Sequence, residues 1–178
     1  MEPIPAQAKG IGNSTTVQQD IETGEDAYPV LMELAESVGS RLRKEKQLAG
    51  MVSCEIKYNT FQSVSHQTTL SMVTDSTTLI YETARHLFNE LWDGTPIRLL
   101  GIRTSKLCDI TEPVQLSLFD MISSDTSVTT AKKESAAMHT SRQQKQEKLD
   151  KALDKIKNKY GKNAIIRGSL LSSDTKKK

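Results

Sequence analysis

The chain has 178 residues, of which 36% are hydrophobic and 26% charged, and its formal net charge is +2. Domains commonly contain roughly 100–150 residues, so this length accommodates one ordinary domain and a tail. No stretch approaches the roughly 20 apolar residues that cross a bilayer, and the N-terminus lacks the basic start and apolar run of a secretory signal. This composition excludes a membrane helix and favours a cytoplasmic protein.

The charge is unevenly distributed along the chain. Residues 132–178 hold 14 Lys/Arg and 5 Asp/Glu, whereas residues 1–131 hold 10 basic and 17 acidic residues. A basic tail suggests a polyanionic partner, although the solvated face of an ordinary helix has the same composition. Charge alone leaves both interpretations open.

The first third of the chain predicts a linker, a strand and a helix. Residues 1–10 contain two prolines and no periodicity, as expected for the remnant of a linker. Ile11–Val17 is rich in β-compatible residues and predicts a short strand. Residues 26–47 predict a helix that ends before Gly50, because its apolar residues recur on one face. These residues are Leu31, Leu34, Ala35, Val38 and Leu42.

Two strands, a helix and a last strand are predicted next. Residues 51–58 alternate between apolar and polar side chains, and residues 64–73 are rich in Thr, Val and Leu, which is typical of an antiparallel pair. A helix follows over residues 76–92, with Asp75 as its expected N-cap. Residues 97–107 alternate again and complete the pattern.

The order strand–helix–strand–strand–helix–strand predicts an α+β domain over residues 11–112. It is the ferredoxin-like split βαβ arrangement (β-α-β-β-α-β), a four-stranded sheet with two helices on one face. The other face would be open, and the residues that alternate onto it are mostly polar or basic: Ser53, Lys57, Ser65, Arg103 and Ser105. Such a face suits a partner, but antiparallel sheets also expose one face to water alone.

The remainder predicts a peptide, a linker and a helical segment. Residues 113–120 contain Gln115-Leu116-Ser117-Leu118-Phe119-Asp120, which has the form of an extended peptide that fills a preformed pocket. Residues 121–146 have scarcely a large apolar side chain and predict a flexible linker. A C-terminal helical segment over 147–171, with its helix over 147–160, precedes a disordered basic tail over 172–178.

The sequence offers little for catalysis or metal binding. Cys54 and Cys108 lie in apolar patterns without the spacing of zinc ligands, so both are expected to be inert core residues. The acidic cluster of Glu22, Glu25 and Asp26 begins a helix, where the helix dipole favours it. Asp150 and Asp154 alternate with lysines, as on a solvated helix. His66, His86 and His139 have no arranged nucleophilic partner, and no Gly-rich phosphate loop occurs.

Three stretches resemble the Y-family lesion-bypass DNA polymerases of the DinB/UmuC (ImpB/MucB/SamB) class, in the order of that family. Gly10-Ile11-Gly12-Asn13-Ser14-Thr15-Thr16 resembles the entry into the family's little-finger domain. Residues 91–103, LWDGTPIRLLGIR, resemble the end of that domain. Residues 148–162 resemble the helix that follows the clamp-binding peptide in several bacterial members. In addition to these three stretches, residues 115–120 resemble that peptide itself.

The resemblance implies a noncatalytic C-terminal region of a polymerase with roles in DNA repair, translesion synthesis and the SOS response. In this family the palm, fingers and thumb perform nucleotidyl transfer with two metal ions, so the parent enzyme would use Mg²⁺, and this fragment would need no cofactor. The implied partners are template-primer DNA, the bacterial sliding clamp and the catalytic core of the same parent chain. The clamp-binding residues would be Gln115, Leu116, Leu118 and Phe119.

The implied DNA contacts lie on the open sheet face and read no sequence. The candidates are Ser14, Thr15, Lys57, Ser65, His66, Thr68, Arg103 and Ser105. Ser14 and Thr15 would offer backbone N–H groups, and His66 reaches the open face only if a bulge shifts the register. Glu55 and the acidic domain predict weak DNA binding by the isolated chain, because nonspecific affinity comes mainly from phosphate neutralisation.

A freestanding ferredoxin-like module that binds nucleic acid or protein is the alternative, since fold alone does not define function. An RNA-binding version would need aromatic side chains on the open face to stack bases. Tyr58 and Phe61 are the aromatic residues near it, and Tyr58 is predicted to point inward.

Overall fold

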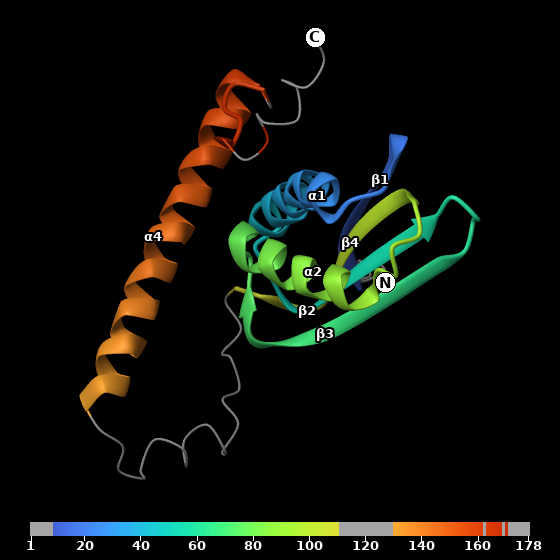
Figure 1. The fold of residues 1–178 in the computed structure, drawn as a ribbon. Helices are drawn as coiled ribbons and strands as arrows, with labels where there is room; N and C mark the ends of the chain where they lie inside the picture. Colours follow the sequence, from blue (N-terminus) through green and yellow to red (C-terminus); the bar gives the residue numbers. More distant parts are fainter. Residues whose placement is uncertain (1–8, 111–129, 162, 169, 171–178) are drawn as a thin grey trace, which may run out of the picture.

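The computed structural model describes residues 9–110, 130–161, 163–168 and 170, with side chains left undescribed over 130–144. The strands form one four-stranded sheet, and Figure 1 shows helices covering one face of it, with the long C-terminal helix beside them. The elements are β1 (Gly10–Ile21), α1 (Gly24–Lys44), β2 (Gln47–Tyr58), β3 (Ser63–Thr74), α2 (Thr77–Leu91), β4 (Ile97–Asp109) and α4 (Thr130–Tyr160). The predicted α+β class and element order are confirmed.

The sheet order is β1-β4-β2-β3, and every neighbouring pair is antiparallel. It follows that β1 and β2 run parallel with β4 between them, and that β3 and β4 run parallel with β2 between them. Each β-α-β unit is therefore split by a strand of the other unit. This interleaving brings the first and last strands of the domain together.

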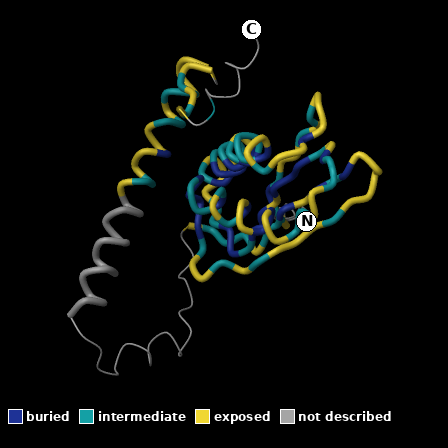
Figure 2. Tube along the Cα trace, viewed as in Figure 1, coloured by how far each residue is buried: buried dark blue, intermediate teal, exposed yellow. Residues whose placement is uncertain are grey.

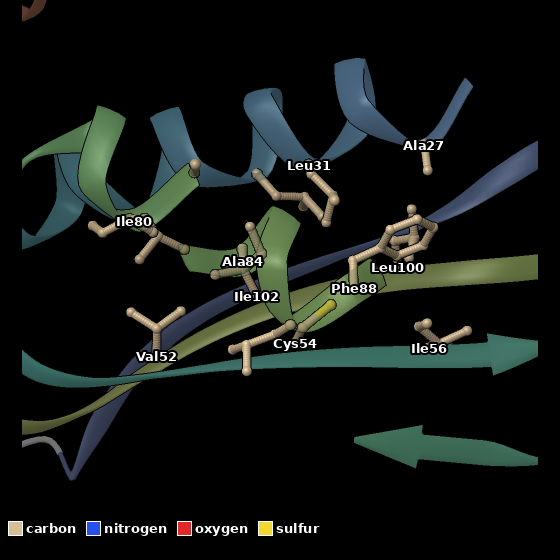
Figure 3. Packing of buried hydrophobic residues seen from close by; sticks show 14 of the residues in the cluster. Ala27, Leu31, Val52, Cys54, Ile56, Ile80, Ala84, Phe88, Leu100 and Ile102 are labelled. Carbon is tan, nitrogen blue, oxygen red and sulfur yellow. The ribbon is translucent and has the colours of Figure 1, made fainter. Parts of the chain in front are cut away.

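The hydrophobic core lies between the sheet and the two helices (Figure 3). α1 packs on β1 and β4, and α2 packs on β2 and β3. All five apolar positions predicted for the first helix are buried, as are Val52, Cys54, Ile56 and Tyr58 of β2. The predicted alternation of β2 is thereby confirmed. Figure 2 shows the burial along each element, with the buried residues in dark blue on the helices and strands of the domain.

The first helix begins and ends earlier than the sequence pattern predicts. Thr23 is its N-cap: the Thr23 hydroxyl oxygen accepts from the Asp26 backbone N–H at 3.2 Å and the hydroxyl donates to the Asp26 carboxylate at 2.6 Å. The helix ends at Lys44, and β2 starts at Gln47 after Lys46 adopts φ 54°. Gly50 therefore lies inside β2, where the prediction took it for a helix stop.

The turn between α2 and β4 is built by the most specific stretch of the family resemblance. The Trp92 indole N–H donates to the Thr95 carbonyl at 2.9 Å, and the Trp92 ring stacks on Phe88. The Thr95 N–H donates to the Asp93 carboxylate at 2.9 Å, and Gly94 adopts φ 92°. Hydrogen bonding from Thr95 lowers the pKa of Asp93. The stretch thus sets how β4 enters the sheet.

Beyond β4, the C-terminal helix starts earlier than predicted. α4 begins at Thr130, so the linker boundary at 146 was wrong. Ala, Lys, Glu, Gln and Met dominate residues 131–147, and their helix propensity suffices without an apolar stripe. The predicted clamp peptide over 113–120 and the tail over 172–178 lie outside the described residues. No helix in the described ranges is long and apolar enough to cross a membrane.

The two cysteines differ in burial. Cys54 lies in the core, where desolvation and the neighbouring Glu55 raise the pKa of its thiol to about 12, so it is inert at neutral pH. Cys108 is half-buried, with its sulfur 3.7 Å from the Leu48 carbonyl oxygen. The prediction of a core residue is confirmed for Cys54 and only partly met by Cys108.

Candidate nucleic-acid interface

The sheet face opposite the helices consists of four rows of side chains, which follow from the strand register. Each row takes one residue from β1, β4, β2 and β3 in that order. The rows are Gly10–Ser105–Met51–Thr69, Gly12–Arg103–Ser53–Gln67, Ser14–Gly101–Glu55–Ser65 and Thr16–Leu99–Lys57–Ser63. Glycine, serine and threonine dominate these rows, so the side chains of this face are mostly short and polar.

Glycines allow Arg103 to lie along the face. A Cβ on Gly12 would approach the Arg103 Cβ and Cγ atoms to 3.2 Å, and one on Gly10 would approach the Arg103 Nε atom to the same distance. The stem of Arg103 therefore lies over the two glycines of β1. In the next row, a Cβ on Gly101 would meet the Ser14 Cβ at 3.2 Å. Larger residues at these positions would displace the guanidinium or raise the surface.

Three basic side chains belong to this face: Lys57, Arg103 and Lys106. Strict alternation would turn Lys106 toward the core, but φ 51° at Lys106, opposite the register irregularity around Gly50, brings it out. Its ammonium donates to the Thr69 hydroxyl at 3.2 Å. The sequence interpretation missed Lys106, although an isolated glycine inside a strand pattern is a signal of a bulge.

One acidic side chain, Glu55, stands between the rows of Arg103 and Lys57. In the described part of the chain, no ion pair joins Lys57 or Arg103 to a carboxylate. The four rows contain no aromatic residue, because Tyr58 points inward and is 5% exposed. Phe61 lies at the β2–β3 turn with the Lys57 ammonium 5.6 Å from its ring. The face can hold phosphates but offers no base-stacking platform.

Three predicted contacts lie on the other side of the sheet. His66 pairs with Cys54 and Thr68 with Val52, so both point to the helix side, where they line a shallow pocket with α2. No bulge shifts this part of β3, and His66 instead lies 3.7 Å from Glu90. Thr15 shares the helix side of β1 with Ile11. Placing the side chains of His66 and Thr68 on the open face was wrong, because β3 keeps strict alternation here. The contact predicted for Thr15 is through its backbone N–H and stays a prediction.

The remaining predicted contacts do share the open face. Ser14, Lys57, Ser65, Arg103 and Ser105 occupy the rows defined above. The Ser14 backbone N–H donates to its neighbour Asn13 at 3.0 Å, so a phosphate would have to replace that side chain. Whether these residues contact DNA remains a prediction.

Behind the helices, α4 docks through a network of charged side chains. The Arg43 Nε donates to the Asp154 carboxylate at 2.5 Å and the Arg43 Nη2 donates to its other oxygen at 3.2 Å. The same guanidinium donates to the Asp75 carbonyl at 2.7 Å. At the C-terminal end, Lys157 and Arg167 donate to the Glu36 carboxylate at 2.7 and 2.6 Å. α4 therefore lies on the helical layer, away from the open sheet face.

Asp150 caps α2 from the far end of the chain. α2 has Ser76 at its N-cap position but no side-chain cap of its own. Instead, the Thr77 backbone N–H donates to Asp150 at 3.1 Å, and Arg167 donates to the second Asp150 oxygen at 2.9 Å. The Asp150 side chain is only 1% exposed. The prediction of a solvated Asp150 and Asp154 pair was therefore wrong.

Asp75 does not have the capping role that was predicted for it. It is buried, and desolvation raises its pKa, which the nearby charges of Arg43 and Lys151 partly oppose. An acidic residue just before a helix commonly caps it. Here the carboxylate that caps the N-terminal end of α2 is that of Asp150.

The described ranges contain no group of three or more His, Cys, Asp or Glu residues placed to hold a metal ion. Glu25 and Asp26 lie in the first turn of α1, as predicted.

Comparison with known proteins places this arrangement in a family. Residues 8–118 match the impB/mucB/samB family C-terminal domain. The DNA polymerase IV of Clostridium acetobutylicum is 36% identical over 170 residues, which cover 96% of this chain and 38% of that protein. The DNA polymerase IV of Clostridium kluyveri is 34% identical over 164 residues, covering 92% of this chain and 38% of that protein.

A solved post-insertion binary complex of Dbh DNA polymerase shares the fold. Its TM-score is 0.52 at 14% identity, and the match covers 61% of this chain and 32% of that one. At this identity the likeness concerns the fold alone.

The fold and the family model together define a Y-family polymerase C-terminal domain. The chain belongs to the impB/mucB/samB family, as the three stretches of sequence had indicated. It spans well under half the length of the polymerases that it matches.

Proposed function

We propose that this chain is the noncatalytic C-terminal region of a translesion DNA polymerase, which grips template-primer DNA without sequence specificity through the open sheet face. The carrying observation is the flat face of glycine, serine and threonine on which Lys57, Arg103 and Lys106 lie without carboxylate partners in the described part of the chain. Nucleotidyl transfer, with Mg²⁺, would belong to the rest of the parent chain.

The chemistry of the face supports phosphate contacts over base recognition. Lys, Arg and Ser side chains position a duplex through its backbone and convey no sequence information. Base-edge recognition needs protruding side chains that enter a groove, whereas these rows are dominated by glycine and short hydroxyl residues. An enzyme that copies damaged templates benefits from a grip that ignores the bases.

Docking on a sliding clamp through residues 115–119 is the second part of the proposal. Gln115 would supply amide hydrogen bonds, and Leu118 with Phe119 would fill an apolar pocket. The peptide begins within a few residues of the end of β4 at Asp109. Because it lies outside the core pattern, it can engage a partner while the domain stays folded.

The DNA contact is tested with the variant Lys57→Gln, Arg103→Gln and Lys106→Gln in the full chain. A labelled primed duplex is titrated at several salt concentrations and followed by fluorescence anisotropy. We expect weaker binding and a shallower dependence of affinity on salt, by about 0.9 in the logarithmic slope for each phosphate that the variant no longer neutralises. Unchanged affinity and unchanged salt dependence in the variant would contradict the proposal. Tighter binding of structured RNA than of the duplex would favour the alternative of a freestanding ferredoxin-like binding module.

Clamp binding is tested by calorimetry with a bacterial sliding clamp. Leu118→Ala with Phe119→Ala should abolish binding, because these side chains are the compact apolar anchor. The matched control is Leu170→Ala, in another apolar part of the tail. Retained clamp affinity in the double variant would mean that a different surface binds the clamp.

A further inference from the structure

The docked helix α4 separates charges that alternate in its sequence. Lysines and aspartates interleave along residues 148–155, a pattern that placed both on one solvated surface. In the structure, one stripe of the helix faces the domain: Gln146, Asp150, Asp154 and Lys157 each bond to a residue of α1 or α2. Both acids of the helix core are thus turned inward.

A second stripe lies on the opposite side of the helix. It consists of Lys145, Lys148, Lys151, Lys155 and Lys159, which recur every three or four residues and are all exposed. At about 1.5 Å per residue the stripe is about 21 Å long. None of the five forms an ion pair within the described ranges. We call these five residues the lysine stripe.

Docking strengthens the positive field of the lysine stripe. In a free helix, Asp150 and Asp154 would be solvated within one or two turns of the lysines and would offset them. Bound to Arg43, Arg167 and the first turn of α2, these carboxylates have other partners. The acidic first part of the chain would also repel a polyanion. A basic surface held at a fixed place on the domain would therefore direct an approaching polyanion to that place.

We propose that the lysine stripe of docked α4 is a second binding site for the phosphate backbone of DNA, separate from the open sheet face. Phosphates on one strand repeat every 3.4 Å or so along the axis of a duplex, so the stripe can follow about six of them. Lysines are point charges that bind phosphates without base recognition. The site would hold DNA beside the domain while the sheet grips the primer-template.

The geometry favours DNA over an anionic membrane. Helices that lie on membranes insert an apolar face into the bilayer while their basic face stays near the headgroups. Here the side opposite the lysines is the polar docked stripe, held to the domain by hydrogen bonds and ion pairs. The apolar residues beside the lysines form no continuous exposed face for a bilayer, because Leu149 and Tyr160 are exposed whereas Leu153 and Ile156 between them are half-buried.

The test compares two variants of the whole 178-residue chain that change the same three lysines to different residues. Lys148→Gln, Lys155→Gln and Lys159→Gln remove three charges, whereas Lys→Arg at the same positions keeps them; Lys151 is left unchanged because it also acts on Asp75. Duplex binding is measured by anisotropy across a salt series. We expect the Gln variant to bind the duplex several-fold more weakly. The slope of the logarithm of its affinity against the logarithm of the salt concentration should be shallower by up to about 2.7, and the Arg variant should match the original chain.

The outcomes separate this site from the sheet face. An unchanged affinity and slope in the Gln variant overturns the lysine stripe, even if the open-face variant loses affinity. Loss in the Gln variant alone supports the stripe and overturns the sheet grip, and a chain with no measurable DNA binding overturns both. Vesicles of equal parts phosphatidylcholine and phosphatidylserine complete the test: lysine-dependent binding to them without an effect on DNA would overturn the proposal.

Discussion

The open face of the sheet and the docking surface of α4 both contain arginine, lysine and acidic side chains, but they use them differently. On the docking surface, Arg43, Lys157 and Arg167 each reach a carboxylate at 2.5–2.7 Å. On the open face, Arg103 lies over two glycines, and Lys57 lies near the ring of Phe61.

This difference indicates what each region is for. Charges that are buried and paired with each other are costly to desolvate and make specific structure, and removing one partner leaves the other uncompensated. Exposed charges without a protein partner contribute little to stability and remain available to a ligand. Substitutions on the docking surface should therefore change folding, whereas substitutions on the open face should change binding.

The largest effect is expected for Asp150→Ala. It removes the cap of α2 and leaves Arg167 without one of its partners, so we expect the docked helix to lose about 3 kcal/mol of stability. Hydrogen exchange should show faster exchange in α4 and at the first turn of α2. Asp150→Asn is the matched control, because an amide oxygen can still accept from the Thr77 N–H, and its loss should be clearly smaller. Equal protection in all three chains would contradict the capping role.

A smaller effect, on binding alone, is expected for Glu55→Gln. Removing the acid between the rows of Arg103 and Lys57 should strengthen duplex binding about twofold to fivefold at low salt, or about 0.5–1 kcal/mol. Unfolding by denaturant should change by no more than about 0.5 kcal/mol, as at other surface sites. The control, Glu82→Gln, removes the same charge from α2 on the opposite side of the sheet. An equal gain in both variants would show a general charge effect.

The smallest effect is expected for Asp75→Asn. Burial raises the pKa of Asp75 in the folded chain, so the folded state binds the proton more tightly than the unfolded state. Its contribution to stability is therefore greatest below the unfolded pKa and is lost as the pH rises through the folded pKa. The Asn variant should lack this dependence and gain on the order of 0.5 kcal/mol at neutral pH. Denaturation at several pH values measures both, and a loss of stability at neutral pH would show that the Asp75 charge is used.

The sequence correctly predicted the buried faces of elements whose apolar residues recur with a regular period. The buried faces of α1 and β2 follow from the spacing of Leu31 to Leu42 and Val52 to Tyr58, because core residues recur at the period of the element. The inward orientation of Tyr58 and the polar open face follow from the same alternation. These positions depend on neighbours in sequence, so one chain suffices to find them.

What the sequence did not predict depends on pairing between distant segments. His66 and Thr68 were misplaced because the face of a β3 residue depends on its register with β2. Lys106 was missed because its backbone conformation, with φ 51°, determines its side of the sheet in place of the alternation. Asp150 has the local surroundings of a solvated residue, and only its contact with Thr77 reveals its role.

The cap of α2 also has a consequence for the order in which the molecule is completed. Thr77 and Asp150 are separated by 73 positions, so a ribosome must translate most of the tail before α2 receives its capping carboxylate. Domains generally fold as units during synthesis, from the N-terminal end. The nascent sheet and helices would thus pass through a stage in which the N-terminal end of α2 has no capping carboxylate, until α4 is translated and docks.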